Sequence, residues 1–435
     1  MAKLAIEGGR KTVTRHPAPW PRLGPDETKA AMAAVKAASK DPSMLSCPDG
    51  RGIVAKFEER FARKMGTKYA MTTCGGGPAL HIALMAAGVQ AGDEVICPTY
   101  SWGQSVSCVL QANAIPIFAD IDPDTYTMTA KTIEAKLTRY TRAIVVVHIF
   151  GHPVDMGPIM RLARRRGIPV IEDAAQATGA KYKGKRVGSL GDIGCFSIGD
   201  GKQIIGGEGG LLLTSDRGLY ERGLLTGHHP VRHWQITDPE LKAWSDSLIY
   251  TYRMYPMAAV ICNVMLDKMD RLNAERRRNY RLLSKGLADI PGIKVPVVKK
   301  NCEHVFHIYS PTFVPEEVEG VKREVWVEAL GAEGMPIGMG YVWRPIHLRR
   351  RLVRHAYFSG RGVPWTLHRG KKDIRYRKGD CPVAEARCAN TELSIWGGPA
   401  WIGDQSKIVE QFLRAFRKVT DNLDVLRKRS KQKRK

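Results

Sequence analysis

Two residues with chemically capable side chains lie at or near the ends of predicted strands. Asp173 ends the short strand 170–173, and Lys202 lies in a glycine-rich turn between the strands 193–198 and 210–214. An ionised carboxylate in a partly desolvated crevice is stable only beside a cation, although an aspartate here can also be an ordinary helix N-cap. A lysine in such a turn is better placed for a covalent bond to an aldehyde than for a salt bridge on a helix face.

Three further features complete a possible cofactor site. The turn 74–78 leads from a strand into a helix, and its Gly76 and Gly77 can offer backbone N–H groups to a phosphate or simply relieve crowding. Trp102 follows the next strand and can stack on a planar ring or belong to the core. Ser197 precedes the lysine and can donate to a phosphate. A ring-nitrogen acid, a Schiff-base lysine, a stacking ring and a phosphate cradle together indicate a pyridoxal 5'-phosphate site.

Short apolar runs alternate with helical patterns between residues 66 and 215. The predicted strands are 68–74, 94–98, 115–120, 143–150, 170–173, 193–198 and 210–214. Strands separated by helices indicate a mostly parallel sheet covered on both faces, and such sheets bind ligands at the carboxyl ends of their strands. The candidate residues lie at those ends. The sequence therefore predicts an α/β fold with a large, mostly parallel, seven-stranded sheet domain.

The rest of the chain predicts a small α+β C-terminal domain. A long amphipathic helix begins at residue 256, and its three consecutive arginines, 276–278, are expected on the polar face. Further patterns predict a strand at 306–314 and helices at 321–330 and 408–426. The predicted division is an N-terminal arm and large domain over 1–275, a small domain over 276–426 with a surface insertion at 357–379, and a basic disordered tail at 427–435.

Composition and charge narrow the class of protein. The 435 residues hold 68 Lys and Arg against 43 Asp and Glu, a formal net charge of +25, and 43% of them are hydrophobic. This composition excludes collagen and low-complexity disorder. Nine cysteines without a Cys-x-x-Cys pair argue against a disulfide framework or a zinc ribbon. Without a long apolar run or a secretory signal, a cytoplasmic protein with no membrane contact is expected, and no aromatic and basic pattern supports specific nucleic-acid recognition.

Several stretches resemble the DegT/StrS-type sugar aminotransferases, which have the aspartate aminotransferase fold (fold type I). The stretches that carry the resemblance are 79–84, 92–96, 147–151, 172–177, 206–210 and 382–385, and the likeness runs from about residue 4 to 419. The resemblance implies pyridoxal phosphate as cofactor and a homodimer whose active sites are shared between the two chains. The opening residues 4–9 and 19–21 look like the subgroup that acts on keto-cyclitols or makes aminohydroxybenzoate.

The resemblance also implies roles for individual residues. It implies that Lys202 forms the Schiff base, Asp173 pairs with the pyridine nitrogen, Trp102 stacks on the ring, Gln176 lies beside the ring, and Ser197 with the Gly76–Gly77 backbone holds the phosphate. His148, Arg344 and His347 are candidate substrate contacts, although either histidine can equally be a structural one. No further ligand pattern beside His228, His229 and His233 supports a metal site.

Two residues depart from the family pattern. Gly77 stands where the family has a threonine, which removes a hydroxyl from the phosphate turn. Thr251 stands where the family has the asparagine that crosses to the phosphate of the partner chain. These departures concern the cofactor's phosphate and leave the lysine in place.

The expected activity is transfer of an amino group from L-glutamine or L-glutamate to a ketone on a cyclitol or sugar, by a ping-pong Schiff-base mechanism. In that mechanism the amine of Lys202 acts as general base and acid. One alternative is a dehydratase and aromatase similar to 3-amino-5-hydroxybenzoate synthase, which keeps the lysine. A second is a non-catalytic relative that binds nucleic acid through its basic surface. Arg344, Arg349 to Arg351 and the basic insertion near His347 suggest an acidic or phosphorylated acceptor.

Overall fold

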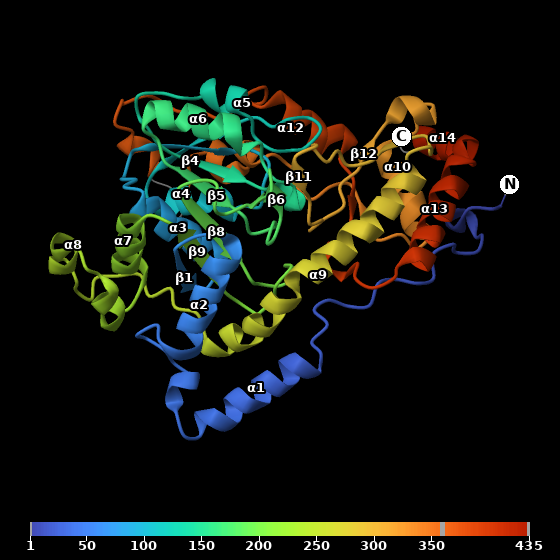
Figure 1. Cartoon of the computed structure of the whole chain (residues 1–435). Helices are drawn as coiled ribbons and strands as arrows, with labels where there is room; N and C mark the ends of the chain where they lie inside the picture. The colour runs from blue at the N-terminus through green and yellow to red at the C-terminus, as the bar shows by residue number, and fades with distance from the viewer. Residues whose placement is uncertain (1, 357–361, 433–435) are drawn as a thin grey trace.

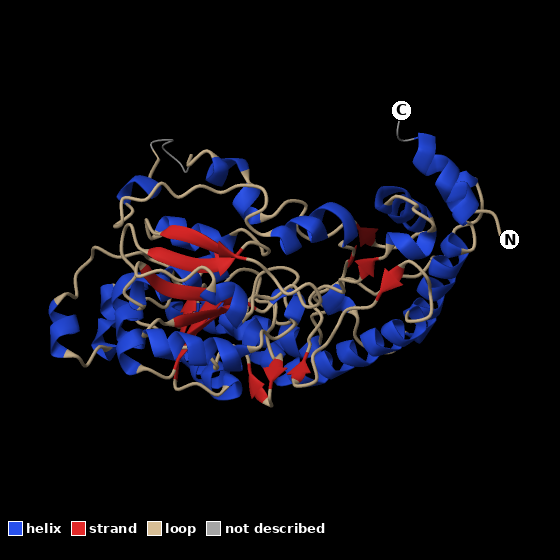
Figure 2. Ribbon diagram, turned by 90° about the horizontal axis from the view of Figure 1, so that it is seen from above, coloured by secondary structure: helices blue, strands red, loops and turns tan. Residues whose placement is uncertain are grey.

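The computed structural model describes residues 2–356 and 362–432. A seven-stranded sheet lies at its centre, with helices on both sides (Figures 1 and 2). In spatial order its strands are β1 (Tyr69–Thr73), β9 (Gly210–Thr214), β8 (Ile193–Ser197), β5 (Val170–Asp173), β4 (Thr141–Val147), β2 (Glu94–Pro98) and β3 (Ile115–Ala119). All seven predicted strands are confirmed, and so is the predicted fold class.

Only one strand of the sheet runs against the rest. β2, β3, β4, β5 and β8 pair in parallel, whereas β9 is antiparallel to both β8 and β1. The parallel strands are almost wholly buried, as expected when helices cover both faces. Their carboxyl ends consequently meet at one edge, where a ligand can reach several loops at once.

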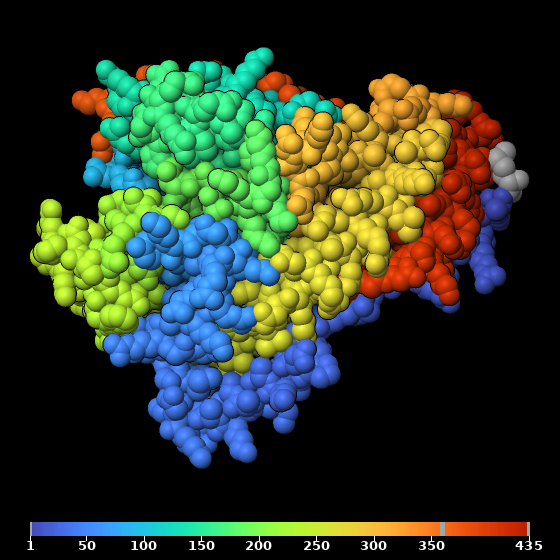
Figure 3. All heavy atoms as spheres, in the orientation of Figure 1, coloured from blue at the N-terminus to red at the C-terminus, as the bar shows by residue number. Residues whose placement is uncertain are grey.

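Two layers of helices cover the sheet. One face carries α3 (Gly76–Ala86), α4 (Gln104–Gln111) and α7 (Arg217–Gly227), and a buried apolar cluster joins them to the strands. The other face carries α2 (Gly52–Met65), α5 (Ala130–Glu134), α6 (Met156–Arg166) and the first half of α9 (Pro256–Leu287). α1 (Pro25–Ala38) packs on α9 and projects from the body of the molecule (Figures 1 and 3).

The C-terminal part has its own apolar core. It joins the second half of α9 to α10 (Arg323–Ala332), α13 (Ser406–Thr420) and α14 (Leu423–Gln432). The remaining elements are the helices α8 (Pro239–Ala243), α11 (Arg350–Val353) and α12 (Pro382–Ala386), and the short strands β6 (Lys181–Tyr182), β7 (Lys185–Arg186), β10 (Ile293–Lys294), β11 (Cys302–Glu303), β12 (Thr312–Phe313), β13 (Ile337–Gly338) and β14 (Ser394–Ile395). Of the predicted strand 306–314 only β12 forms. The proposed domain boundary at 275/276 falls inside α9.

The tail is helical rather than disordered over its described residues. α14 continues to Gln432, and residues 433–435 lie outside the described part. Leu426 is buried in the C-terminal core, and Arg429 pairs with Glu7 near the other end of the chain. These contacts explain why a basic segment that looks fully solvated in the sequence forms a docked helix.

The segment predicted as a surface insertion is partly buried. Its first residues, 357–361, lie outside the described residues, but Trp365 and Tyr376 pack into the large core beneath the sheet edge. The indole N–H of Trp365 donates to the Tyr376 hydroxyl at 2.8 Å, and His368 pairs with buried Glu94 at 2.9 Å. More than half of residues 362–379 are exposed, and a few large side chains anchor the segment to the core.

None of the helices in residues 2–356 and 362–432 is long and apolar enough to cross a membrane.

Candidate active site

Seven of the predicted site residues line one cavity of about 330 Å³ at the carboxyl ends of the parallel strands. Gly76 and Gly77 come from the start of α3, Trp102 follows β2, Asp173 and Gln176 lie at and after the end of β5, Ser197 ends β8, and Lys202 lies between β8 and β9. The first and last of these residues, Gly76 and Lys202, are 126 positions apart in the sequence. The topology of the sheet brings them together, because each strand ends at the same edge.

Asp173 is the most constrained acid in the cavity. One carboxylate oxygen accepts a hydrogen bond from Ser105 Oγ at 2.6 Å, and the other accepts the Ala175 N–H at 3.1 Å. Burial raises the pKa of Asp173 above that of an ordinary aspartate, whereas both hydrogen bonds and the charge of Lys202 oppose this rise. The result is a fixed carboxyl group that a cation in the cavity would hold ionised.

Lys202 faces the same cavity from the opposite loop. Burial lowers the pKa of Lys202 below that of an ordinary lysine, against the pull of Asp173 and Asp200. A lowered pKa increases the fraction of neutral amine, which is the nucleophilic and basic form. The Lys202 main-chain carbonyl accepts the indole N–H of Trp20 at 2.7 Å, so the N-terminal arm fixes the turn that carries the lysine.

The Trp20 ring in turn covers a buried arginine. The Arg276 guanidinium lies 4.7 Å from the ring centroid and donates to the Pro399 carbonyl at 2.9 Å and to Asn273 at 2.7 Å. The expectation that the arginines of this helix lie on its polar face is wrong for Arg276, which is fully buried. Its role is to join α9 to the C-terminal part beneath the site.

The turn at the start of α3 packs tightly against β8 and α4. A Cβ at Gly76 would lie 3.0 Å from Ser197 Cβ, and a Cβ at Gly77 would lie 3.3 Å from Gln104. Ser197 Oγ accepts the Gly199 N–H at 3.3 Å and remains at the cavity wall. Free N–H groups at a helix start, a hydroxyl and a cradle that a Cβ would fill are the features a bound phosphate requires. The residues present therefore fit pyridoxal phosphate.

Aromatic and amide groups close the cavity. Gln176 accepts the Phe150 N–H at 2.7 Å and donates to the Tyr341 hydroxyl at 3.1 Å, so its amide is fixed. The ring of Trp102 lies 5.9 Å from the ring of Tyr341. Trp102 is 56% exposed, so its ring is free to cover a bound planar group.

The two predicted histidines lie outside the cavity, and both are buried. His148 Nδ1 accepts the Val154 N–H at 3.0 Å, and its Nε2 donates to Glu172 at 2.9 Å. His347 contacts the Thr99 hydroxyl through Nδ1 and Glu385 through Nε2 at 3.1 Å. Both ring nitrogens of each histidine have protein partners, so this geometry favours the structural alternative over substrate contact.

Arg344 and Thr251 also lie outside the cofactor cavity. Arg344 lines an adjacent cavity of about 660 Å³ together with Arg349, Arg350 and Arg351. Gln104 lines both cavities and marks where they adjoin. Thr251 is exposed in the loop before α9, next to Tyr252, whose carbonyl accepts the N–H of Cys74 in the phosphate turn at 2.9 Å.

Three positioning residues were missed by sequence reasoning. Ser105 holds Asp173, Trp20 holds the Lys202 turn, and Tyr341 holds Gln176. Ser105 follows Ser101 by one helical turn, and the two hydroxyls lie 2.8 Å apart, so that spacing is a weak signal. Trp20 and Tyr341 are 182 and 165 residues from their partners, and no local pattern indicates such contacts.

A buried carboxylate, a lysine with a lowered pKa and a phosphate cradle at the carboxyl edge of this sheet define a pyridoxal-phosphate-dependent aminotransferase of fold type I. The sequence matches the DegT/DnrJ/EryC1/StrS aminotransferase family over residues 26–361. The chain belongs to that family, and its cofactor is pyridoxal phosphate.

Known proteins with similar sequences are named for sugar or cyclitol substrates. GDP-perosamine synthase of Escherichia coli O157:H7 is 40% identical over 59% of this chain and 67% of its own length. The L-glutamine:2-deoxy-scyllo-inosose aminotransferase of Streptomyces paromomycinus is 33% identical over 96% of this chain and 97% of its own. An aminotransferase structure from Psychrobacter cryohalolentis superimposes with a TM-score of 0.78 at 26% identity, covering 94% of this chain and all of that one.

Proposed function

We propose that this protein transfers an amino group from L-glutamine or L-glutamate to a ketone on a cyclitol or sugar. The observation that carries the proposal is the placement of Lys202 and Asp173 in one cavity beside the phosphate turn. Bound pyridoxal phosphate supplies an electron sink for the carbon that carries the amino group. The protein's own residues must therefore hold the ring, exclude water and move one proton.

Each residue has a distinct part in this proposal. Asp173 holds the proton on the pyridine nitrogen through charge, with Ser105 fixing its carboxylate. Lys202 Nζ takes the proton from the donor α-carbon and later returns a proton, as general base and acid. Trp102 would cover one face of the ring, and the Gly76–Gly77 N–H groups with Ser197 would hold the phosphate.

The acceptor is proposed to enter from the adjacent cavity lined by Arg344 and Arg349. Relatives named for a deoxy-scyllo-inosose and for a GDP-linked sugar support the two acceptor classes. The positive charge of the arginines in this adjacent cavity favours an acceptor that bears an acidic or phosphate group. We further propose a homodimer in which Thr251 reaches the partner's phosphate site, since this residue is exposed beside the phosphate turn.

Replacement of Lys202 tests the proposed amino-group transfer. Purified Lys202→Ala protein, loaded with cofactor, is expected to transfer amine at least about 10³-fold more slowly than wild type, because general acid–base catalysis is lost. Lys185→Ala, which changes an exposed lysine, is the matched control. Wild-type turnover by Lys202→Ala would contradict the proposal.

A labelled donor identifies the acceptor and separates the alternative chemistry. L-glutamine or L-glutamate carrying ¹⁵N at the α-amino group is offered with a keto-inositol, a nucleotide-linked keto-sugar or an aminoshikimate-type ketone. Mass spectrometry of an aminated cyclitol or sugar that contains ¹⁵N supports the proposal. Loss of water with formation of an aromatic product, and no transfer of ¹⁵N, would instead assign the aminohydroxybenzoate-type reaction.

A further inference from the structure

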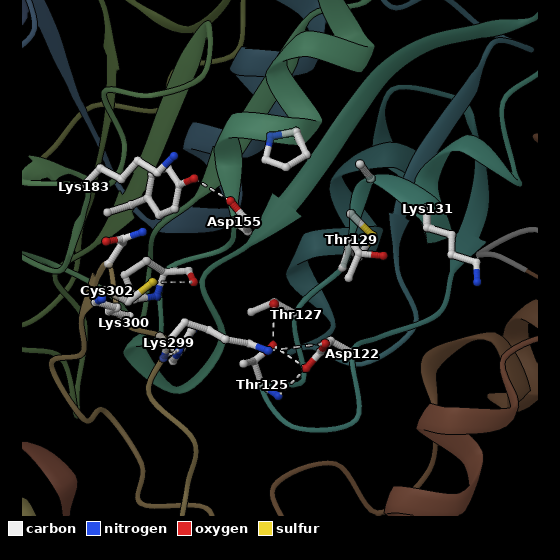
Figure 4. Close-up of a pocket in the computed structure, with 17 residues that line it drawn as sticks. Asp122, Thr125, Thr127, Thr129, Lys131, Asp155, Lys183, Lys299, Lys300 and Cys302 are labelled. Atoms are coloured by element: carbon white, nitrogen blue, oxygen red, sulfur yellow. Dashed lines mark hydrogen bonds and ion pairs between the residues drawn. The ribbon is translucent and has the colours of Figure 1, made fainter.

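A second cavity, of about 400 Å³, shares no lining residue with the cofactor site. It is formed where residues 122–131 and 152–158, which lead into α5 and α6, meet the hairpin residues 182–183 and the segment 299–302 (Figure 4). Its size lies in the range of small-molecule sites. Four stretches of the chain that are far apart in sequence thus enclose a space that the proposed transamination does not use.

The walls of this cavity carry more positive than negative charge. Lys131, Lys183, Lys299 and Lys300 line it, against Asp122 and Asp155. Figure 4 shows Lys299 extended toward Asp122, and their charged groups lie 3.9 Å apart.

The other cations of the lining are not neutralised by the protein. Among the residues that the structure describes, Lys131, Lys183 and Lys300 form no ion pair with a carboxylate. All three are exposed, and the Lys183 ammonium lies 5.2 Å from the centroid of the Tyr182 ring. Asp155 accepts a hydrogen bond from the Tyr182 hydroxyl rather than pairing with a lysine. The cavity therefore attracts an anion that the protein itself does not provide.

An apolar wall adds to this charge. Pro153 and Pro158 line the cavity beside Thr125, Thr127 and Thr129, whose hydroxyls already bond to Asp122, to one another and to Thr132. Such a mixture suits a ligand that has an organic body as well as an anionic group.

We propose that this cavity binds a small phosphorylated metabolite, with its phosphate held by lysine ammonium groups and its organic body packed against the apolar wall. Lysines are common phosphate ligands in proteins. A sugar phosphate and a nucleotide share this chemistry, and the experiment below distinguishes them. This site is independent of the proposed transamination.

The test uses the full-length protein loaded with pyridoxal phosphate, so that the cofactor's own phosphate turn is occupied. Isothermal titration calorimetry measures Kd for inorganic phosphate, glucose 6-phosphate and uridine monophosphate, with glucose and uridine as the counterparts without phosphate. Binding of a phosphorylated probe, at least 10-fold tighter than its counterpart, is expected. The tighter of the two organic phosphates identifies the ligand class.

Paired variants locate the binding. Lys131→Gln with Lys300→Gln is expected to raise Kd at least 10-fold, whereas Lys40→Gln with Lys242→Gln removes the same charge from exposed positions elsewhere and should leave Kd unchanged. Equal Kd values in the two double variants, or no binding of any phosphorylated probe, would overturn the proposal. Loss of binding only in Arg344→Gln with Arg349→Gln would overturn it as well, by assigning the ligand to the cavity beside the cofactor site.

Discussion

Ser105 Oγ lies 2.6 Å from Asp173 Oδ2, and both side chains are buried. The serine comes from α4 and the aspartate from the end of β5, so a helix on one face of the sheet fixes an acid at its edge. Asp173 has no cationic side chain within ion-pair distance among the described residues. Its orientation thus depends on a neutral hydroxyl and one backbone N–H.

Removal of this hydroxyl is expected to weaken cofactor binding. A hydrogen bond to a charged group contributes roughly 1.5–3 kcal/mol, so Ser105→Ala should raise Kd for pyridoxal phosphate about 10-fold. Equilibrium dialysis measures this change directly. Ser107→Ala, which alters the same type of side chain in the same helix, is the control, and an equal Kd in the two variants would show that Ser105 does not act on Asp173.

The same variant should shift the pH dependence of activity. Ser105 lowers the pKa of Asp173, so its loss raises that pKa and reduces the ionised fraction at any acidic pH. The acid limb of kcat/KM against pH is therefore expected to move to higher pH in Ser105→Ala. An unmoved limb, with kcat/KM reduced equally at all pH values, would point to a purely structural effect.

A methyl group at Gly76 should narrow the phosphate cradle. Its Cβ would lie 3.0 Å from Ser197 Cβ, so either the turn or β8 must shift. Overpacking of this kind costs about 1–3 kcal/mol, and Gly76→Ala should raise Kd for the cofactor about 10-fold or more. In Gly331→Ala the new Cβ meets nothing within 4 Å inside α10, so that control should keep its cofactor affinity and gain up to about 1 kcal/mol in stability.

The N-terminal arm should affect turnover through Lys202. Trp20→Phe keeps an aromatic ring but removes the N–H that donates to the Lys202 carbonyl. A neutral hydrogen bond contributes about 1 kcal/mol, so we expect kcat to fall about 5-fold while KM for the donor changes little. Steady-state kinetics separate the two constants. Trp244→Phe, at an exposed tryptophan, is the control. An unaltered kcat in Trp20→Phe would show that the N-terminal arm does not affect catalysis.

A buried ion pair beside the edge strand β1 should contribute strongly to the free energy of unfolding. Arg232 donates to both carboxylate oxygens of Glu58, at 2.6 and 3.0 Å, and Glu58 also accepts the Thr72 N–H at 2.6 Å. Glu58→Ala leaves the guanidinium buried without a counter-charge, which should lower the free energy of unfolding by about 3–5 kcal/mol. Urea denaturation measures this change. Glu59→Ala, one exposed position along α2, should stay within about 0.5 kcal/mol of wild type.

The sequence predicts the sheet and the groups that line the cofactor cavity because both follow local rules. Each strand is a short apolar run between helical patterns, and Asp173 and Lys202 lie at or beyond strand ends that meet at one edge. The prediction is less successful where a role depends on distant partners. Histidines often bind substrates, but the Nε2 atoms of His148 and His347 are hydrogen-bonded to Glu172 and Glu385 inside the protein.

Charge is the least reliable guide among the sequence features. Arg276 lies in a run of three arginines, but the carbonyl of Pro399 and the ring of Trp20 give it a buried site. The basic segment after residue 426 forms a docked helix, because Leu426 is buried in the C-terminal core. No local sequence pattern indicates either outcome. The buried site of Arg276 depends on residues more than a hundred positions away, and the docking of the last helix depends on how it packs against other elements.

α9 crosses the proposed domain boundary without a break. At 1.5 Å per residue, its 32 residues form a rod about 48 Å long. Its first half is buried against the sheet domain and its second half against the C-terminal helices, and Figure 1 shows the helix running from one part to the other. A protease that normally cuts between domains at an exposed linker would therefore find none at 275/276, and separation of the two parts there would first require this helix to unwind.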